Sequence, residues 1–140
     1  MRDTAILLPA LSLVGWTLLV LLLVPYRRFK AAFAGQVSAR DFKFGESERV
    51  PPDVSIPNRN FMNLLEAPVL FYVVCVVAFV THNADAAAVN LAWTYFGLRV
   101  AHSLVHLTYN KVMHRLMAYA ASMVVLVSMW IHLLVAVASS

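Results

Sequence analysis

Ionisable and amide side chains that could do chemistry fall at regular intervals in two short stretches of this apolar chain. In the first stretch, Arg59, Asn63 and Glu66 are spaced four and three residues apart. Side chains at this spacing lie on one face of an α-helix. A planar guanidinium binds carboxylates through two parallel hydrogen bonds. The stretch therefore offers groups that recognise an anionic ligand.

The second stretch carries Arg99, His102 and His106, which are three and four residues apart and also share one helical face. A further arginine, Arg115, opens the next apolar segment. Arginines outnumber carboxylates in the combined set. This balance favours an anionic, water-soluble ligand over a proton path, because proton carriers more often use lone carboxylates or histidines.

Two other interpretations of these residues stay open at this point. Glu66 and Arg99 could form an ion pair that only holds two helices together, since polar side chains fix helix packing in membranes. Alternatively, Glu66 could carry protons in a small exporter, which requires that it be reached from each side of the membrane in turn. The residues alone do not decide among a ligand pocket, a structural pair and a proton path.

The composition places these polar residues inside a membrane. Of the 140 residues, 61% are hydrophobic and only 13% are charged, whereas soluble domains carry about 25% charged residues. About 20 apolar residues in a helix cross the ~30 Å hydrocarbon core, and four stretches are long enough. The sequence predicts a single all-α membrane domain over residues 1–140, an up-down bundle of four transmembrane helices at about 4–27, 58–81, 86–109 and 112–138.

The basic residues predict the orientation of the bundle. Six of the eleven Lys and Arg residues fall between residues 27 and 58, and on the opposite side only Arg2 is basic. Because basic loops stay in the cytoplasm, we expect the loop at about 28–57 to be cytoplasmic and both termini to be outside. The first stretch is too long for a cleaved signal peptide. The short, loop-poor chain suits a bacterial inner membrane, and its basic excess does not indicate nucleic-acid binding.

The two polar stripes should lie at matching depth. Glu66 is about eight residues beyond the expected helix start, or ~12 Å deep, and His102 is about seven residues from the expected helix end, or ~10 Å deep from the same side. They are thus predicted to face one pocket that opens to the cytoplasm. A metal centre is not expected, because the single cysteine excludes a Cys-rich site and no His-Cys ligand spacing occurs.

These residues resemble a known family. The run from Arg59 through Asn63 to Glu66, followed by Pro68, resembles the Arg-x-x-x-Asn-x-x-Glu signature of the MAPEG family, the membrane-associated proteins in eicosanoid and glutathione metabolism. Arg99-Val100-Ala101-His102 is similar to the Arg-x-x-His of microsomal glutathione transferases. Arg115, sixteen residues after Arg99, falls where some of these enzymes carry a further arginine. The resemblance covers nearly the whole chain.

The resemblance implies a homotrimer that holds glutathione between neighbouring subunits near the cytoplasmic face. Arg59 and Arg99 would then hold the carboxylates, with Asn63 as an amide partner. Glu66 would accept the ammonium group. Arg115 would be catalytic and would stabilise the thiolate, which attacks lipophilic electrophiles that arrive from the bilayer. The implied activity is that of a glutathione transferase or peroxidase.

One position departs from the family pattern. Seven residues after Arg99, where related enzymes often carry tyrosine, this chain has His106, and Tyr109 follows one helical turn later. His102, His106 and Tyr109 are therefore also expected to contact glutathione. The departure leaves an alternative open, a non-enzymatic lipid-binding protein or an accessory subunit of a larger membrane complex.

Overall fold

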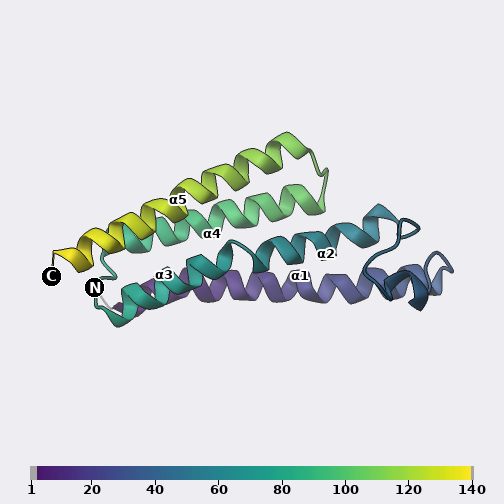
Figure 1. Cartoon of the computed structure of the whole chain (residues 1–140), viewed down its shortest axis with the longest axis horizontal. Coiled ribbons are helices and arrows are strands. Elements are labelled where there is room, and N and C mark those ends of the chain that lie inside the picture. The colour runs from purple at the N-terminus through teal and green to yellow at the C-terminus, as the bar shows by residue number, and fades with distance from the viewer. Residues whose placement is uncertain (1–2, 140) are drawn as a thin grey trace.

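The structure, a computed structural model, describes residues 3–139, and all regular secondary structure in this part of the chain is helical (Figure 1). Arg2, used above for the orientation, lies outside the described residues. In chain order the elements are η1 (Asp3–Ile6), α1 (Leu7–Phe33), η2 (Ala39–Phe42), α2 (Pro52–Leu65), α3 (Pro68–Val80), α4 (Ala86–Leu107) and α5 (Val112–Ala138).

Three helical stretches are long and apolar enough to cross a membrane, namely Asp3–Phe33, Pro52–Val80 and Val112–Ala138. The chain is accordingly a multi-pass membrane protein. The remaining long helix, α4, has 22 residues and carries a buried arginine and two buried histidines. A fourth crossing by α4 stays a prediction, as does the orientation of the termini.

The helices form two side-by-side groups. In Figure 1, α1 runs beside α2 and α3, while α4 runs antiparallel to α5. Helix α5 contacts α3 and α4, whereas α2 contacts α1 and α4. As a result the bundle is closed at the end that holds α3, and α2 and α5 stand apart towards the α4–α5 turn. The candidate site lies at this open end.

The ends of the first two helical segments differ from the prediction. Helix α1 runs on to Phe33, past the predicted end at residue 27. Positive charge marks the end of the membrane but not of the helix, because Lys and Arg favour helices and suit the C-terminal dipole. Helix α2 begins at Pro52, six residues before the predicted start, because proline is preorganised for the first turn. The loop therefore spans only residues 34–51.

The predicted second helix is broken near its middle. Helix α2 ends at Leu65, and α3 begins at Pro68. Proline has no N–H to donate to the carbonyl of Leu64, and its ring clashes with that carbonyl. Glu66 lies in the break with ψ −96°, outside the helical range. The three- and four-residue spacing that places side chains on one face of a continuous helix therefore does not hold beyond Leu65.

Helix α4 buries one face along its whole length. Small residues and an aromatic ring occupy the half near its start, and polar residues occupy the half that approaches the α4–α5 turn. Apart from the adjacent pair His102 and Ser103, successive buried positions are three or four residues apart, which is the helical repeat. They are Ala88, Ala92, Tyr95, Arg99, His102, Ser103 and His106.

A buried polar contact joins three helices beside the candidate site. Trp16 of α1 donates its Nε1 hydrogen to Ser103 Oγ at 2.9 Å. Asn60 of α2 donates from Nδ2 to the same oxygen at 2.6 Å. Hydrogen bonds between helices fix their register in an apolar interior. Ser103 thereby holds α1, α2 and α4 at one level.

Replacing Ser103 with alanine is expected to lower the free energy of unfolding by about 1 kcal/mol, because two buried donors lose their acceptor. Unfolding of the purified protein in mixed detergent micelles measures the change. Ser128→Ala is the matched control, since Ser128 Oγ bonds only to Val124 O of its own helix. Equal losses in the two variants would contradict the assigned role of Ser103.

The loop at residues 34–51 is organised around one carboxylate. Asp41 accepts hydrogen bonds from Ser38 N at 2.8 Å and Ser38 Oγ at 3.1 Å, and from Ser47 Oγ at 2.8 Å. The Ser38 backbone bond and then the Ser47 bond hold the pKa of Asp41 below its usual value. A small apolar cluster beneath the loop joins it to α1 and α2 through Ala31, Val37, Val50 and Val54.

The lowered pKa of Asp41 gives the loop a pH dependence. A carboxyl group whose pKa is lower in the folded than in the unfolded protein stabilises the fold when the pH is above the unfolded pKa, ~3.9. This stabilisation is lost as the pH falls through the lower pKa of the folded state. At neutral pH, Asp41→Asn should raise amide hydrogen exchange in residues 34–51 several-fold. Asp53→Asn is the control, because Asp53 is exposed and its contact with Arg27 is long, at 3.9 Å. Unchanged exchange in Asp41→Asn would refute this role.

Candidate functional site

A cavity of about 230 Å³ lies between α2, α4 and the first turns of α5. Three of the residues predicted from sequence line it, namely Asn63, His102 and Arg115. They come from three different helices, so the open end of the bundle brings together residues that are distant in sequence. Val112, Leu116 and Tyr119 complete the lining.

The guanidinium of Arg99 lies against this lining and is fully buried, with 0% of the residue exposed. It donates from Nη2 to the backbone oxygen of Asn63 at 2.6 Å, and its central carbon is 5.5 Å from the Tyr119 ring. Within the described residues, Nε and Nη1 have no hydrogen-bond partner. Buried donors without partners are costly. Arg99 therefore presents unused donors beside the cavity, where they suit an anion.

The two histidines occupy different positions. The His102 ring faces the cavity and is 5.9 Å from the Tyr119 ring. The His106 ring is 6.1 Å from His102 and lies one turn further along α4, buried to 2% exposure and outside the cavity lining. Neither Nδ1 atom has a hydrogen-bond partner in the described part of the chain. The His102 side chain can thus contact a ligand in the cavity, whereas the His106 ring lies behind the lining, next to the His102 ring.

Arg115 is held in place by a turn residue that sequence reasoning did not assign to the site. Its Nη1 donates to Asn110 Oδ1 at 2.8 Å. Asn110 has φ +48°, in the left-handed region that asparagine tolerates better than most residues. Its N–H donates to Val105 O at 2.8 Å and closes the end of α4. From the sequence, only the short gap between the helices predicted at 86–109 and 112–138 pointed to a turn here.

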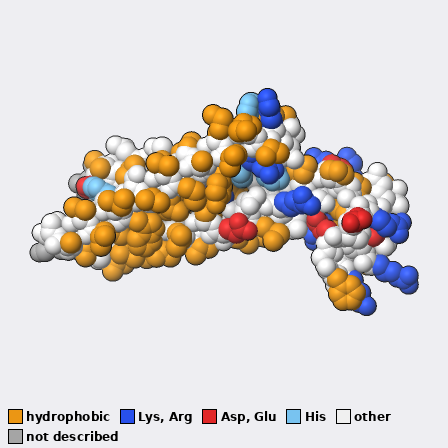
Figure 2. Space-filling view, turned by 45° about the horizontal axis from the view of Figure 1, so that its top comes forward, with side chains coloured by type: hydrophobic (Ala, Val, Ile, Leu, Met, Phe, Trp, Pro, Cys, Tyr) orange, Lys and Arg blue, Asp and Glu red, His pale blue; other side chains and the backbone are white. Residues whose placement is uncertain are grey.

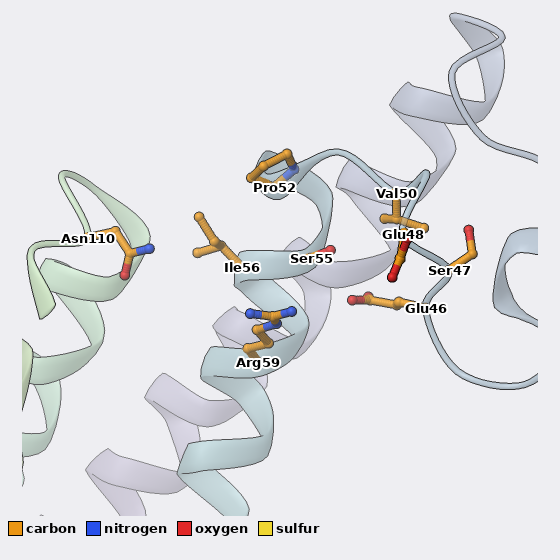
Figure 3. Close-up of a pocket in the computed structure, with 9 residues that line it drawn as sticks. All are labelled: Glu46, Ser47, Glu48, Val50, Pro52, Ser55, Ile56, Arg59 and Asn110. Atoms are coloured by element: carbon orange, nitrogen blue, oxygen red, sulfur yellow. The ribbon is translucent and has the colours of Figure 1, made fainter.

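Arg59 lines a second, neighbouring cavity of about 330 Å³ (Figure 3). Asn110 lines it from the α4–α5 turn, and Glu46 and Glu48 line it from the loop. Asn110 also binds Arg115 of the first cavity, and Arg59 is one helical turn from Asn63. The two cavities are therefore adjacent along one face of α2.

Four of the eight predicted residues line neither cavity: Arg99 and His106 are buried beside the lining, whereas Glu66 and Tyr109 are exposed. Glu66 is exposed and forms no salt bridge within residues 3–139. Tyr109 is 60% exposed, and its hydroxyl is 2.9 Å from His114 Nδ1. Within the described part of one chain, the predicted residues therefore do not line a single pocket. The helices predicted at 58–81 and 86–109 continue through Glu66 and Tyr109, whereas α2 ends at Leu65 and α4 at Leu107.

Tyr119 lines the cavity but was not among the site residues predicted from the sequence. It follows Arg115 by four residues, so the two share a face of α5. Its ring contacts both His102 and Arg99. Its four-residue spacing from Arg115 could have indicated this position from the sequence. The Tyr119 side chain adds a phenol group to the cavity wall.

The charges around the two cavities set the chemistry of the site. Arg59, Arg99 and Arg115 provide three guanidinium groups, and the carboxylates of Glu46 and Glu48 lie on the loop side. On the face shown in Figure 2, Lys and Arg side chains gather at the end that carries the loop and the α4–α5 turn, while the long remainder is hydrophobic. The site therefore suits an anionic molecule that approaches from the water at this end.

Comparison with known proteins gives one match. A family model described as the MAPEG family matches residues 6–135, which include every residue of both cavities. No curated protein and no solved structure matches the chain.

Proposed function

Because this chain belongs to the MAPEG family, we propose that it binds glutathione and uses its thiolate to conjugate or reduce lipophilic electrophiles. Family membership supports a membrane protein of the glutathione and eicosanoid metabolism kind. The finer proposal is carried by one observation, the cavity in which Asn63, His102 and Arg115 meet beside the unused donors of Arg99.

The size and charges of the paired cavities fit glutathione. A tripeptide is about 10 Å long when extended, which is long enough to reach from one cavity to the other, because Arg59 and Asn63 are about one ~5.4 Å helical turn apart on α2. Glutathione carries two carboxylates, one ammonium and one thiol. Arg59 and Arg99 would hold the carboxylates, and the Asn63 amide would bond the peptide backbone. The thiol would then lie near Arg115.

Glu66 supports the proposal that the protein works as an oligomer, which the family resemblance implies is a homotrimer. It is exposed near the middle of the span Pro52–Val80, and a charge at the centre of a membrane helix costs on the order of 2.5–3.5 kcal/mol on insertion scales. A neighbouring subunit that covers Glu66 would remove it from lipid. Glu66 would then accept the ammonium of a glutathione held mainly by that neighbour, and Tyr109 would contact the same interface.

The chemistry needs a thiolate. A thiol with a pKa near ~8.5 is only a few per cent ionised at pH 7, and an adjacent guanidinium favours the ionised form. The thiol proton passes to water. The sulfur then donates its electron pair to an electrophilic carbon, and the displaced pair departs with the leaving group. With a hydroperoxide, two glutathione molecules would be oxidised to the disulfide, releasing one alcohol and one water.

The predicted orientation agrees with this chemistry. The loop and the α4–α5 turn carry the basic residues that favour the cytoplasmic side, and both cavities open at this end. Glutathione would enter from the cytoplasm of a bacterium, and apolar co-substrates would enter from the inner membrane.

Titration of bound glutathione, followed by the ultraviolet absorbance of its thiolate, tests the proposed activity. We expect the bound thiol to ionise at least one pH unit lower than free glutathione, and Arg115→Gln to abolish most of that difference. A bound thiol that ionises as in water would contradict the conjugating activity. It would favour the alternative, a non-enzymatic lipid-binding or accessory subunit.

A further inference from the structure

A third cavity, of about 540 Å³, lies on the other side of the loop and shares no lining residue with the candidate site. One face of α1 forms its floor, from Leu21 through Val24 and Arg28 to Ala32. Loop residues between Val37 and Phe42 form its roof. Eight of its ten lining residues are apolar. It is thus a groove with an apolar wall at the end of a membrane-spanning helix.

The groove changes polarity along its length. Leu21 and Ala32 are eleven residues apart on α1, so the groove extends about 16 Å along the helix axis. Its Leu21 end lies in the uncharged part of the span, whereas its other end reaches the basic residues that begin at Arg27. A phospholipid that stands in one leaflet has the same order of polarity, with an acyl chain followed by a phosphate.

Cations surround the polar end of the groove. Arg28 lines it and bonds Glu46 through Nη2 at 3.2 Å, while its buried Nε has no partner among the described residues. Arg40 and Lys43 directly follow the lining residues Ala39 and Phe42. Neither forms a salt bridge in the part of the chain that the structure describes. Arg40 and Lys43 therefore offer positive charge next to the groove that no ion pair within the described residues neutralises, whereas Arg28 is paired with Glu46.

Exposed aromatic side chains stand beside these cations. Phe33, at the end of α1, is 90% exposed, and Phe44, next to Lys43, is 92% exposed. Phenylalanine and lysine together on one surface are typical of segments that lie in the headgroup region of a bilayer. Figure 2 shows this loop end as the place where Lys and Arg side chains gather. The groove thus opens where lipid headgroups are available.

We propose that this groove is a binding site for an anionic phospholipid of the surrounding leaflet. One acyl chain lies between α1 and the loop, and the phosphate is bound by Arg28, Arg40 and Lys43. A second copy of the chain fits the rim poorly, because its corresponding end carries the same excess of positive charge. The bound lipid would hold the loop against α1 without entering the glutathione site.

The proposal is tested by native mass spectrometry of the full chain in detergent. Phosphatidylglycerol and phosphatidylcholine with identical acyl chains are titrated separately, and glycerol phosphate is added as a headgroup without tails. The wild type should bind phosphatidylglycerol about 10-fold more tightly than phosphatidylcholine, or better, since each basic residue near an anionic lipid contributes about 1 kcal/mol. Glycerol phosphate at equal concentration should not compete. Equal binding of both lipids, or full competition by glycerol phosphate, would overturn the proposal.

Two variants separate the apolar groove from its charged rim. Ala32→Phe fills the groove and should abolish binding of both lipids, whereas Ala34→Phe, at an exposed position outside the lining, should not. The double variant Arg40→Gln with Lys43→Gln should lose the preference for phosphatidylglycerol. Lys111 is exposed between α4 and α5, far along the chain from the groove, so the control Lys111→Gln should keep the preference. Wild-type affinity and preference in Ala32→Phe or in the double variant would refute the site. Dissociation of an oligomer by Ala32→Phe, with lipid affinity unchanged, would assign the groove to a subunit interface instead.

Discussion

Arg115→Ala is expected to lower the kcat of glutathione-dependent turnover by about 100-fold or more, which is the usual cost of removing one group that stabilises a developing or reacting anion. Asn110 holds the guanidinium at 2.8 Å, so its charge is fixed at the wall of the cavity that also contains His102. The affinity for glutathione should change much less, because Arg59 and Arg99 would still hold the carboxylates.

Steady-state kinetics with a lipophilic electrophile, measured across pH, provide the test. The rate of the variant should recover as the pH rises, because the thiolate then forms without help from Arg115. Lys111→Ala is the matched control, since Lys111 is basic, exposed and absent from the cavity lining. A kcat within a few-fold of wild type in Arg115→Ala would remove Arg115 from the chemistry.

The second large effect is expected at Arg99. Arg99→Met should weaken glutathione binding by about 10- to 100-fold, because a hydrogen bond to a charged group contributes about 1.5–3 kcal/mol. The fold should survive, since replacing a buried charge by an apolar side chain of similar volume is often neutral or stabilising. Binding calorimetry combined with thermal unfolding therefore separates a ligand-binding arginine from a structural one.

Arg99→Lys sharpens this test. Lysine keeps the charge but lacks the planar fork, so it should restore little of the affinity. Loss of thermal stability in Arg99→Met with glutathione affinity unchanged would show that Arg99 only holds α4 against Asn63. That outcome would revive the structural interpretation, although the ion pair between Glu66 and Arg99 that it first invoked does not occur among the described residues.

Composition was sufficient to predict the all-helical membrane architecture, but not where helices end. Apolar length identifies a segment that prefers lipid, and charge identifies where lipid stops. Helix α1 continues to Phe33 through Arg27, Arg28 and Lys30, because these residues favour helix as readily as the apolar ones before them. The break before Pro68 follows from the missing N–H and the ring of proline, whereas the non-helical conformation of Glu66 depends on the tertiary environment.

The site was predictable where helical spacing alone decides position. Asn63 and His102 face the same cavity because each lies on the polar face of an unbroken helical segment. Asn110 and Tyr119 were not predicted as site residues, and the reason is physical. Asn110 acts through a left-handed turn that directs its amide at Arg115, and Tyr119 acts because α5 packs beside α4. The family resemblance, built on Arg59, Asn63 and Glu66, is confirmed by the family match.

The most direct test of the central claim is calorimetric titration of reduced glutathione into the detergent-purified protein, with Arg59→Ala and Glu66→Gln as the variants. We predict measurable binding to the wild type and its loss in each variant, because Arg59 lines one of the paired cavities and, in the homotrimer that we propose, Glu66 would complete the site of a neighbouring subunit. No binding at millimolar glutathione, in protein shown to be folded and oligomeric, would contradict the account. Binding that both substitutions leave unchanged would contradict it equally, by placing glutathione elsewhere on the chain.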